Sequence, residues 1–172
     1  MHPLRYYTSL IPLLLGWLAG PVLPLVCAVE IAPEVIESQQ NKIAVIARAS
    51  AASISLLDGT GQGGGSGVVI SPDGFALSNF HVTSPAGNFI KCTMPDGRLY
   101  DSVVVGLDPT GDVALIKLVG RANFIPATLG NSDLVRVGDW CFVVGNPFLL
   151  STDFQPSVSS GIVSGIHRYQ YP

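Results

Sequence analysis

Two residues of this sequence have side chains suited to proton transfer. The first lies where one apolar run ends, and the second lies where another begins. His81 lies in Ser-Asn-Phe-His-Val (78–82), and Asp112 opens Asp-Val-Ala-Leu-Ile (112–116). They are 31 positions apart (112 − 81). An imidazole, with an ordinary pKa of about 6.5, accepts and returns a proton near neutral pH. A carboxylate that receives the imidazole N–H fixes the tautomer and orientation of the ring.

Both residues also have a plainer interpretation. A lone histidine after a strand is more often structural, or merely exposed, than catalytic. Asp112 follows Asp-Pro-Thr-Gly (108–111), and an aspartate in such a turn commonly accepts hydrogen bonds from nearby backbone N–H groups. The chemistry of the two residues alone leaves these alternatives open.

Short apolar strands must position the two side chains. Runs rich in Val, Ile, Leu and Phe are separated by turns that contain Pro and Gly, such as Ser-Pro-Asp-Gly (71–74). In these turns Pro presets φ and Gly accepts a positive φ. Strands with turn signals at near-regular spacing predict an antiparallel sandwich or barrel. The predicted strands of this first set are 49–57, 68–70, 75–78, 89–94, 102–107 and 113–119.

Three further segments complete the predicted organisation. Residues 33–48 have the apolar spacing of a short helix, with Pro33 near its first turn. Residues 121–136 are irregular and form a connector, and new strands follow at 137–145 and 160–166. We expect one complete barrel and the start of a second. A half-built barrel exposes strand edges, so the chain is expected to be a piece of a longer one.

The composition and the N-terminus restrict the function classes. The chain has 172 residues, 48% of them apolar, a net charge of −3 and no run of Lys or Arg, so nucleic-acid binding is not expected. Residues 1–28 resemble an export signal with cleavage after Ala28, and an uncleaved membrane anchor is the alternative. Beyond it remain Cys92 and Cys141, which we interpret as two buried free thiols, with a disulfide that export would permit as the alternative.

Cofactor and metal sites are not expected. Residues 59–64 match the pattern G-x-G-x-x-G, but a strand follows them where a dinucleotide site needs a helix. His2 lies in the signal and His167 near the C-terminus, and neither has the spacing of a metal ligand to His81.

Several segments, in the same order along the chain, resemble the HtrA/DegP-like serine proteases of the trypsin fold. The likeness covers roughly Ser66 to Ile166. It implies an all-β, chymotrypsin/trypsin-like double β-barrel whose first barrel is complete and whose second is partial, with the active site between the barrels. It also implies that His81 is the general base and then the general acid, and that Asp112 orients it. The matching segments are 65–70, 73–82, 95–98, 106–117, 131–133, 137–139, 145–148 and 160–164.

The nucleophile of that family has no counterpart here. It lies in a Gly-Asn-Ser-Gly-Gly or Gly-Asp-Ser-Gly-Gly segment, and nothing after Ile166 matches. Ser66 precedes His81 and is interpreted as part of the loop into the first strand. Ser157, Ser159 and Ser160 lack the following Gly-Gly. The oxyanion donors around the nucleophile and a PDZ domain are likewise not expected within these 172 residues. The loop 148–156 is longer than in the commonest relatives.

The resemblance implies an exported serine-type endopeptidase that cleaves unfolded or misfolded proteins in the periplasm or outside the cell. Relatives are often trimers, so a homo-oligomer is compatible with it. The chain alone, without the serine, is expected to be inactive. A non-catalytic peptide-binding pseudoprotease, or a gene remnant, is the alternative. The predicted organisation is signal 1–28, helical segment 29–48, first barrel 49–120, connector 121–136 and second-barrel start 137–172.

Overall fold

The computed structural model describes residues 30–57, 64–147 and 153–168, so the export signal predicted over 1–28 lies outside the described residues. The chain divides into two compact units, 1–32 and 33–172, and every element below belongs to the second. No helix within the described ranges is both long and apolar enough to span a membrane. In chain order the elements are α1 (Pro33–Ala52), β1 (Ser53–Leu57), β2 (Gly64–Val69), β3 (Phe75–Ser78), α2 (Phe80–Thr83), η1 (Ser84–Ala86), β4 (Phe89–Thr93), β5 (Leu99–Asp108), β6 (Val113–Leu118), η2 (Ser132–Leu134), β7 (Trp140–Gly145) and β8 (Ser157–Ile162).

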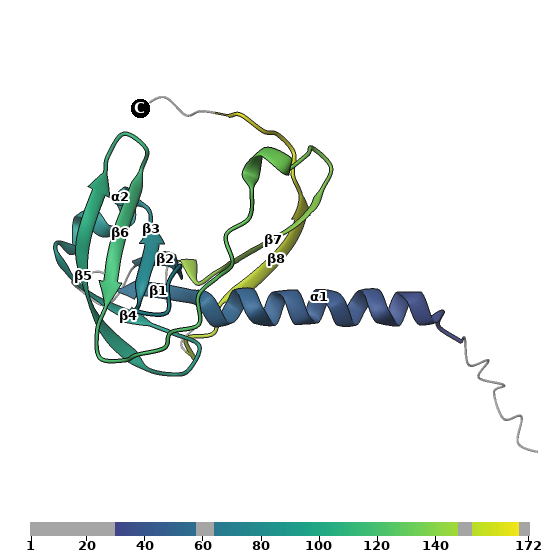
Figure 1. Cartoon of the computed structure of the whole chain (residues 1–172), viewed down its shortest axis with the longest axis horizontal. Coiled ribbons are helices and arrows are strands. Elements are labelled where there is room, and N and C mark those ends of the chain that lie inside the picture. The colour runs from purple at the N-terminus through teal and green to yellow at the C-terminus, as the bar shows by residue number, and fades with distance from the viewer. Residues whose placement is uncertain (1–29, 58–63, 148–152, 169–172) are drawn as a thin grey trace, which may run out of the picture. The chain divides into compact units, whose positions relative to one another are not determined.

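The first six strands close into a barrel in the order β1-β2-β3-β6-β5-β4, and every pair is antiparallel (Figure 1). Alternate residues of each strand point inward, which is why period-two apolar patterns in the sequence become one core. This closed barrel, followed by a second, two-stranded sheet, confirms the predicted fold class. The buried apolar core consists of Ile54, Leu56, Val69, Ala76, Ile90, Cys92, Met94, Tyr100, Ile116, Leu118 and Phe124.

The neighbours β3 and β6 matter most for the site. Their register runs from Phe75 opposite Lys117 to Ser78 opposite Ala114. Beyond that last pair, the residues that follow Ser78 continue alongside the residues that precede Ala114. The pairing therefore brings the segment around residue 80 next to the segment around residue 112.

The second sheet contains only β7 and β8 among the described residues, paired from Trp140 opposite Ile162 to Gly145 opposite Ser157. All six residues of β8 are exposed. Apolar side chains of β7 are exposed too, with 72% of Trp140 and 69% of Val143 accessible. A two-stranded ribbon cannot bury both of its faces by itself.

Helix α1 runs four residues further than the sequence pattern indicates. Residues 49–52 were predicted as the start of a strand, and this prediction is wrong. Alanine is the strongest helix former, and three of these four residues are alanine. The strand begins at Ser53, where pairing with Val68 of β2 starts.

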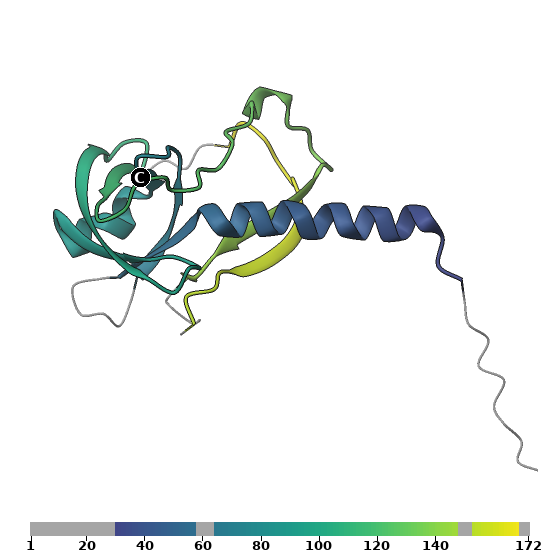
Figure 2. The same ribbon diagram turned by 60° about the horizontal axis from the view of Figure 1, so that its bottom comes forward.

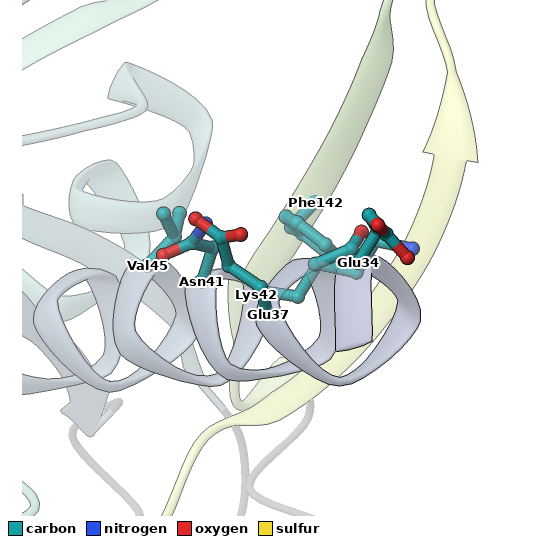
Figure 3. Close-up of a pocket in the computed structure, with 7 residues that line it drawn as sticks. Glu34, Glu37, Asn41, Lys42, Val45 and Phe142 are labelled. Carbon is teal, nitrogen blue, oxygen red and sulfur yellow. The ribbon is translucent and has the colours of Figure 1, made fainter. Parts of the chain in front are cut away.

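Helix α1 lies alongside the second sheet in two views of the molecule (Figures 1 and 2). A groove between α1 and Phe142 of β7 is lined on the helix side by residues that include Glu34, Glu37 and Lys42 (Figure 3). The ammonium of Lys42 lies 5.5 Å from the ring centre of Trp140. The groove is thus lined by charged, polar and apolar helix residues and one aromatic strand residue, and it includes neither His81 nor Asp112.

Both described cysteines are free thiols, as predicted, but only one is buried. Cys92 is inaccessible, and its Sγ lies 3.2 Å from the Ser102 hydroxyl. Burial raises the pKa of Cys92 to about 11, against a smaller lowering effect of the Ser102 hydrogen bond. Cys141 is half-buried, because β7 has a partner strand on one edge and an open face.

We predict that Cys92 resists thiol reagents in the folded protein. With a pKa of about 11, roughly one Cys92 in a thousand is a thiolate at pH 8. Peptide mapping after brief treatment with iodoacetamide should find Cys141 modified and Cys92 intact. In urea, both should be modified at similar rates. Equal rates without denaturant would contradict the burial of Cys92.

Candidate active site

His81 is carried by the four-residue helix α2, which starts two residues after β3 ends. The carbonyl of Asn79, the N-cap residue, accepts hydrogen bonds from the amides of Val82 and Thr83, each at 3.2 Å. A single 3-10 turn, η1, follows α2 directly at Ser84–Ala86. The side chain of His81 reaches Asp112, the residue that directly precedes β6.

Asp112 ends the tight turn before β6 and has φ = 53°, a left-handed conformation that is uncommon outside glycine. The turn is stabilised by another residue. The carboxylate of Asp108 accepts hydrogen bonds from the amides of Thr110 at 3.1 Å and Gly111 at 3.0 Å. The turn-capping role that the sequence allowed for Asp112 thus belongs to Asp108, and the Asp112 carboxylate faces His81.

The structure brings His81 and Asp112 together. The imidazole Nδ1 lies 2.7 Å from Asp112 Oδ2, and the backbone N–H of His81 donates to Asp112 Oδ1 at 2.9 Å. Because an ionised carboxylate only accepts, the hydrogen of the neutral ring must lie on Nδ1, which leaves Nε2 as the proton acceptor. Within the described part of the chain, the His81 ring has hydrogen bonds to Asp112 alone.

The local electrostatics favour an ionised Asp112. The hydrogen bond from the His81 backbone N–H contributes most to lowering the pKa of Asp112. The His81 side chain and the Asn79 amide lower it further, while desolvation acts in the opposite direction. The side chains of His81 and Asp112 are 70% and 43% exposed, so the pair lies at the surface and is open to a reaction partner.

A shallow groove adjoins this pair and is shared by the barrel and β7. Asn79 and Val113, which flank the pair in the sequence, line one part of it, and Ser66 of β2 and Val144 of β7 line another. The groove therefore lies where the two sheets meet, beside the residues that neighbour His81 and Asp112 in the sequence. No cluster of three or more His, Cys, Asp or Glu side chains that could hold a metal ion occurs in the described ranges.

Ser66 fastens the second sheet to the barrel. It was expected in a loop, but it lies within β2, so that expectation is wrong. Its Oγ accepts a hydrogen bond from the amide of the fully buried Asn146 at 2.9 Å, and its carbonyl accepts one from Ser78 Oγ at 2.9 Å. A Cβ at Gly145 would lie 2.7 Å from Ser66 Oγ. The strands β7 and β2 therefore approach so closely here that glycine is favoured at position 145.

Two residues of this arrangement had no assigned role from the sequence. Asn79 donates to the Asp112 carboxylate, and Ser66 joins the sheets. The order Asn-x-His was the only local signal for Asn79, and nothing in the order of residues linked Ser66 to a segment 80 positions further on.

Comparisons with known proteins agree with this architecture. Residues 65–172 match the family model described as a trypsin-like peptidase domain, and the chain belongs to this family. The predicted resemblance to HtrA/DegP serine proteases is confirmed by its relatives. A probable periplasmic serine endoprotease of the DegP-like kind from Chlamydia trachomatis is 42% identical over 107 residues, which are 62% of this chain and 20% of the relative. The periplasmic serine endoprotease DegP of Escherichia coli is 42% identical over 105 residues, 60% of this chain and 21% of the relative.

Solved structures show the same likeness. The HtrA-type protease AlgW, solved with a tripeptide, superimposes with a TM-score of 0.64 at 34% identity, covering 74% of this chain and 41% of that one. A serine-to-alanine variant of AlgW gives a TM-score of 0.63 at 35% identity, covering 73% and 40%. The chain spans about a fifth of the length of the curated relatives.

The close approach of Gly145 to Ser66 leads to a stability prediction. Gly145→Ala should destabilise the folded chain by about 1–3 kcal/mol, because the new methyl group meets Ser66 Oγ and Cβ. Gly161→Ala is the matched control. It lies on the partner strand β8 with nothing within 4 Å, and it should change stability by less than about 0.5 kcal/mol.

Urea unfolding followed by fluorescence measures both effects. Ser66→Gly removes the obstructing atoms, so the double variant Ser66→Gly/Gly145→Ala should lose less stability than the sum of the two single variants. Strictly additive effects would mean that the two residues do not meet as described.

The lowered pKa of Asp112 predicts a pH dependence of stability. Its folded-state pKa lies below the ordinary value of 3.8, so its contribution is present above that value and lost as the pH falls through the folded-state pKa. The difference in urea midpoint between the wild type and Asp112→Asn should therefore shrink between pH 5 and pH 2. Asp73, whose pKa is lowered first by the Ser71 hydroxyl, should show the same trend in Asp73→Asn. A constant difference for Asp112→Asn would contradict the hydrogen bonding described.

Proposed function

We propose that this chain carries the base and its orienting carboxylate of a serine-type endopeptidase, with His81 and Asp112 in those roles. The observation that supports the proposal most directly is the 2.7 Å contact between His81 Nδ1 and Asp112 Oδ2. The contact is made in a barrel whose family is the trypsin-like peptidase domain.

The mechanism follows from the tautomer that this contact requires. With its hydrogen on Nδ1, His81 takes the proton of a serine hydroxyl at Nε2 while the serine oxygen attacks the peptide carbonyl carbon. Asp112 stabilises the imidazolium that forms. His81 then returns the proton to the leaving amine, and the acyl-enzyme remains. Water repeats the sequence and releases the acid, which restores the serine.

The serine and the oxyanion donors would come from residues other than those described here. Among the described serines, none hydrogen-bonds the His81 ring. Ser66 Oγ accepts from the amide of Asn146, and its side chain joins the two sheets. We therefore propose that residues 29–172 by themselves do not hydrolyse peptide bonds.

For the whole protein we propose unfolded or misfolded polypeptides as substrates, and an exported location in the periplasm or outside the cell. The names of the relatives, periplasmic serine endoproteases, support the location and the reaction class. Homo-oligomeric assembly is part of the same proposal. Attachment to a membrane would require residues 1–28 to be retained after export.

The activity test uses the complete natural gene product, including any in-frame codons beyond Pro172. We expect it to hydrolyse casein and to react with a fluorophosphonate. Asp112→Asn should lower kcat by roughly four orders of magnitude, and His81→Ala by roughly six. The control His167→Ala, an exposed histidine, should retain activity within about twofold.

The polypeptide 29–172 should show neither hydrolysis nor labelling. Robust labelling of the native 29–172 polypeptide, with none in a heat-denatured control, would overturn this. The nucleophilic serine would then lie within residues 29–172. A stop codon directly after Pro172 would instead favour a non-catalytic peptide-binding pseudoprotease or a gene remnant.

A further inference from the structure

Asn79 occupies a helix N-cap without acting as one. It precedes α2 with φ = −88° and ψ = 147°, the extended conformation of an N-cap residue, yet its side chain makes no capping hydrogen bond. Asn131, the N-cap of η2, shows the ordinary behaviour, since its side-chain oxygen accepts from the amide of Asp133 at 3.0 Å. The side chain of Asn79 is therefore engaged elsewhere.

Its partner is Asp112. The side-chain nitrogen of Asn79, Nδ2, lies 3.0 Å from the backbone carbonyl oxygen of Asp112 and 3.2 Å from the carboxylate Oδ2. Both of these atoms can only accept, so the NH₂ end of the amide must face them. An NH₂ group has two hydrogens and serves both acceptors, whereas a serine hydroxyl has one hydrogen and an aspartate has none.

These two hydrogen bonds restrain the backbone carbonyl and the carboxylate of Asp112, a residue with a strained backbone. A non-glycine residue at φ = 53° is strained and persists only where its surroundings hold it. Asn79 holds both the main chain of Asp112 and the end of its side chain. Together with the two contacts from His81, it gives the carboxylate one orientation relative to the imidazole.

We propose that Asn79 is a positioning residue of the His81–Asp112 pair, which orients the carboxylate so that it receives the Nδ1–H of His81. A catalytic role of that pair rests on the function proposed above, whereas the positioning of Asp112 by Asn79 does not. The titratable groups on the segments beside Asp112 do not take over the role of the Asn79 side-chain amide. On the turn that contains Asp112, Asp108 is bonded to the amides of Thr110 and Gly111, and on α2 only His81 is titratable.

The first experiment needs no protease activity. In the 172-residue chain labelled with ¹³C-aspartate, NMR titration follows the carboxyl group of Asp112, whose pKa is lowered in part by the Asn79 amide. Asn79→Ser and Asn79→Asp both keep a good N-cap residue. Asn79→Ser should move the Asp112 pKa upward. Asn79→Asp should move it further, because a carboxylate then replaces a donor.

The control Asn131→Ser alters a true N-cap on η2 and should leave the Asp112 titration unchanged. Amide spectra of the β6 residues verify that each variant is folded. A merely structural capping role predicts that Asn79→Ser behaves like Asn131→Ser. An Asp112 pKa in Asn79→Ser equal to that of the wild type would overturn the proposal.

The second experiment measures hydrolysis by the complete gene product. Asn79→Ser should lower kcat roughly 10- to 100-fold with little change in KM, because the imidazole is less well aligned. A kcat within twofold of the wild type would overturn the catalytic part of the inference. If the complete product is inactive while Asn79→Ser still shifts the Asp112 titration, the proposed function fails and the positioning of Asp112 by Asn79 stands.

Discussion

The pairing of β3 with β6 is the constraint on which the site depends. These strands are separated by two others in the sequence, yet they are neighbours in the closed barrel. Their last pair, Ser78 with Ala114, places the start of α2 beside the end of the turn before β6. In the described part of the chain, the hydrogen bonds to the carboxylate and carbonyl of Asp112 come from Asn79 and His81, shortly after β3. A shift of this register by one residue would turn the side chains of β6 to the opposite face of the sheet and dismantle the site.

The site is assembled from small polar groups rather than from deep burial. The Asp112 carboxylate is partly exposed, and three N–H donors favour its ionised form against the opposing effect of desolvation. Such an arrangement relies on orientation. Asn79, the backbone of His81 and the left-handed turn together determine that orientation, and each is supplied by a different local feature of the chain.

The second sheet depends on the barrel in a different way. Residues of β7 and β8 bury little apolar area among themselves, and a short polar junction links them to the barrel. At that junction Ser66 receives the amide of Asn146, and Gly145 permits the close approach. The groove beside His81 is formed by both sheets, so its shape follows from this junction.

Local patterns in the sequence predict most of the strands, the family resemblance and the two candidate residues. Alternating apolar residues and Pro-Gly turns are local signals, and the segments around His81 and Asp112 are distinctive. These patterns misplaced the end of α1, because the boundary at Ser53 is decided by pairing with β2. The folded structure was needed to see that Asp108 caps the turn while Asp112 faces the histidine. It was also needed to see that Asn79 and Ser66 have partners 33 and 80 residues away. A side-chain hydrogen bond forms or fails on differences of about a few tenths of an ångström between donor and acceptor. Strand register and barrel closure establish these distances, and the local sequence does not encode them.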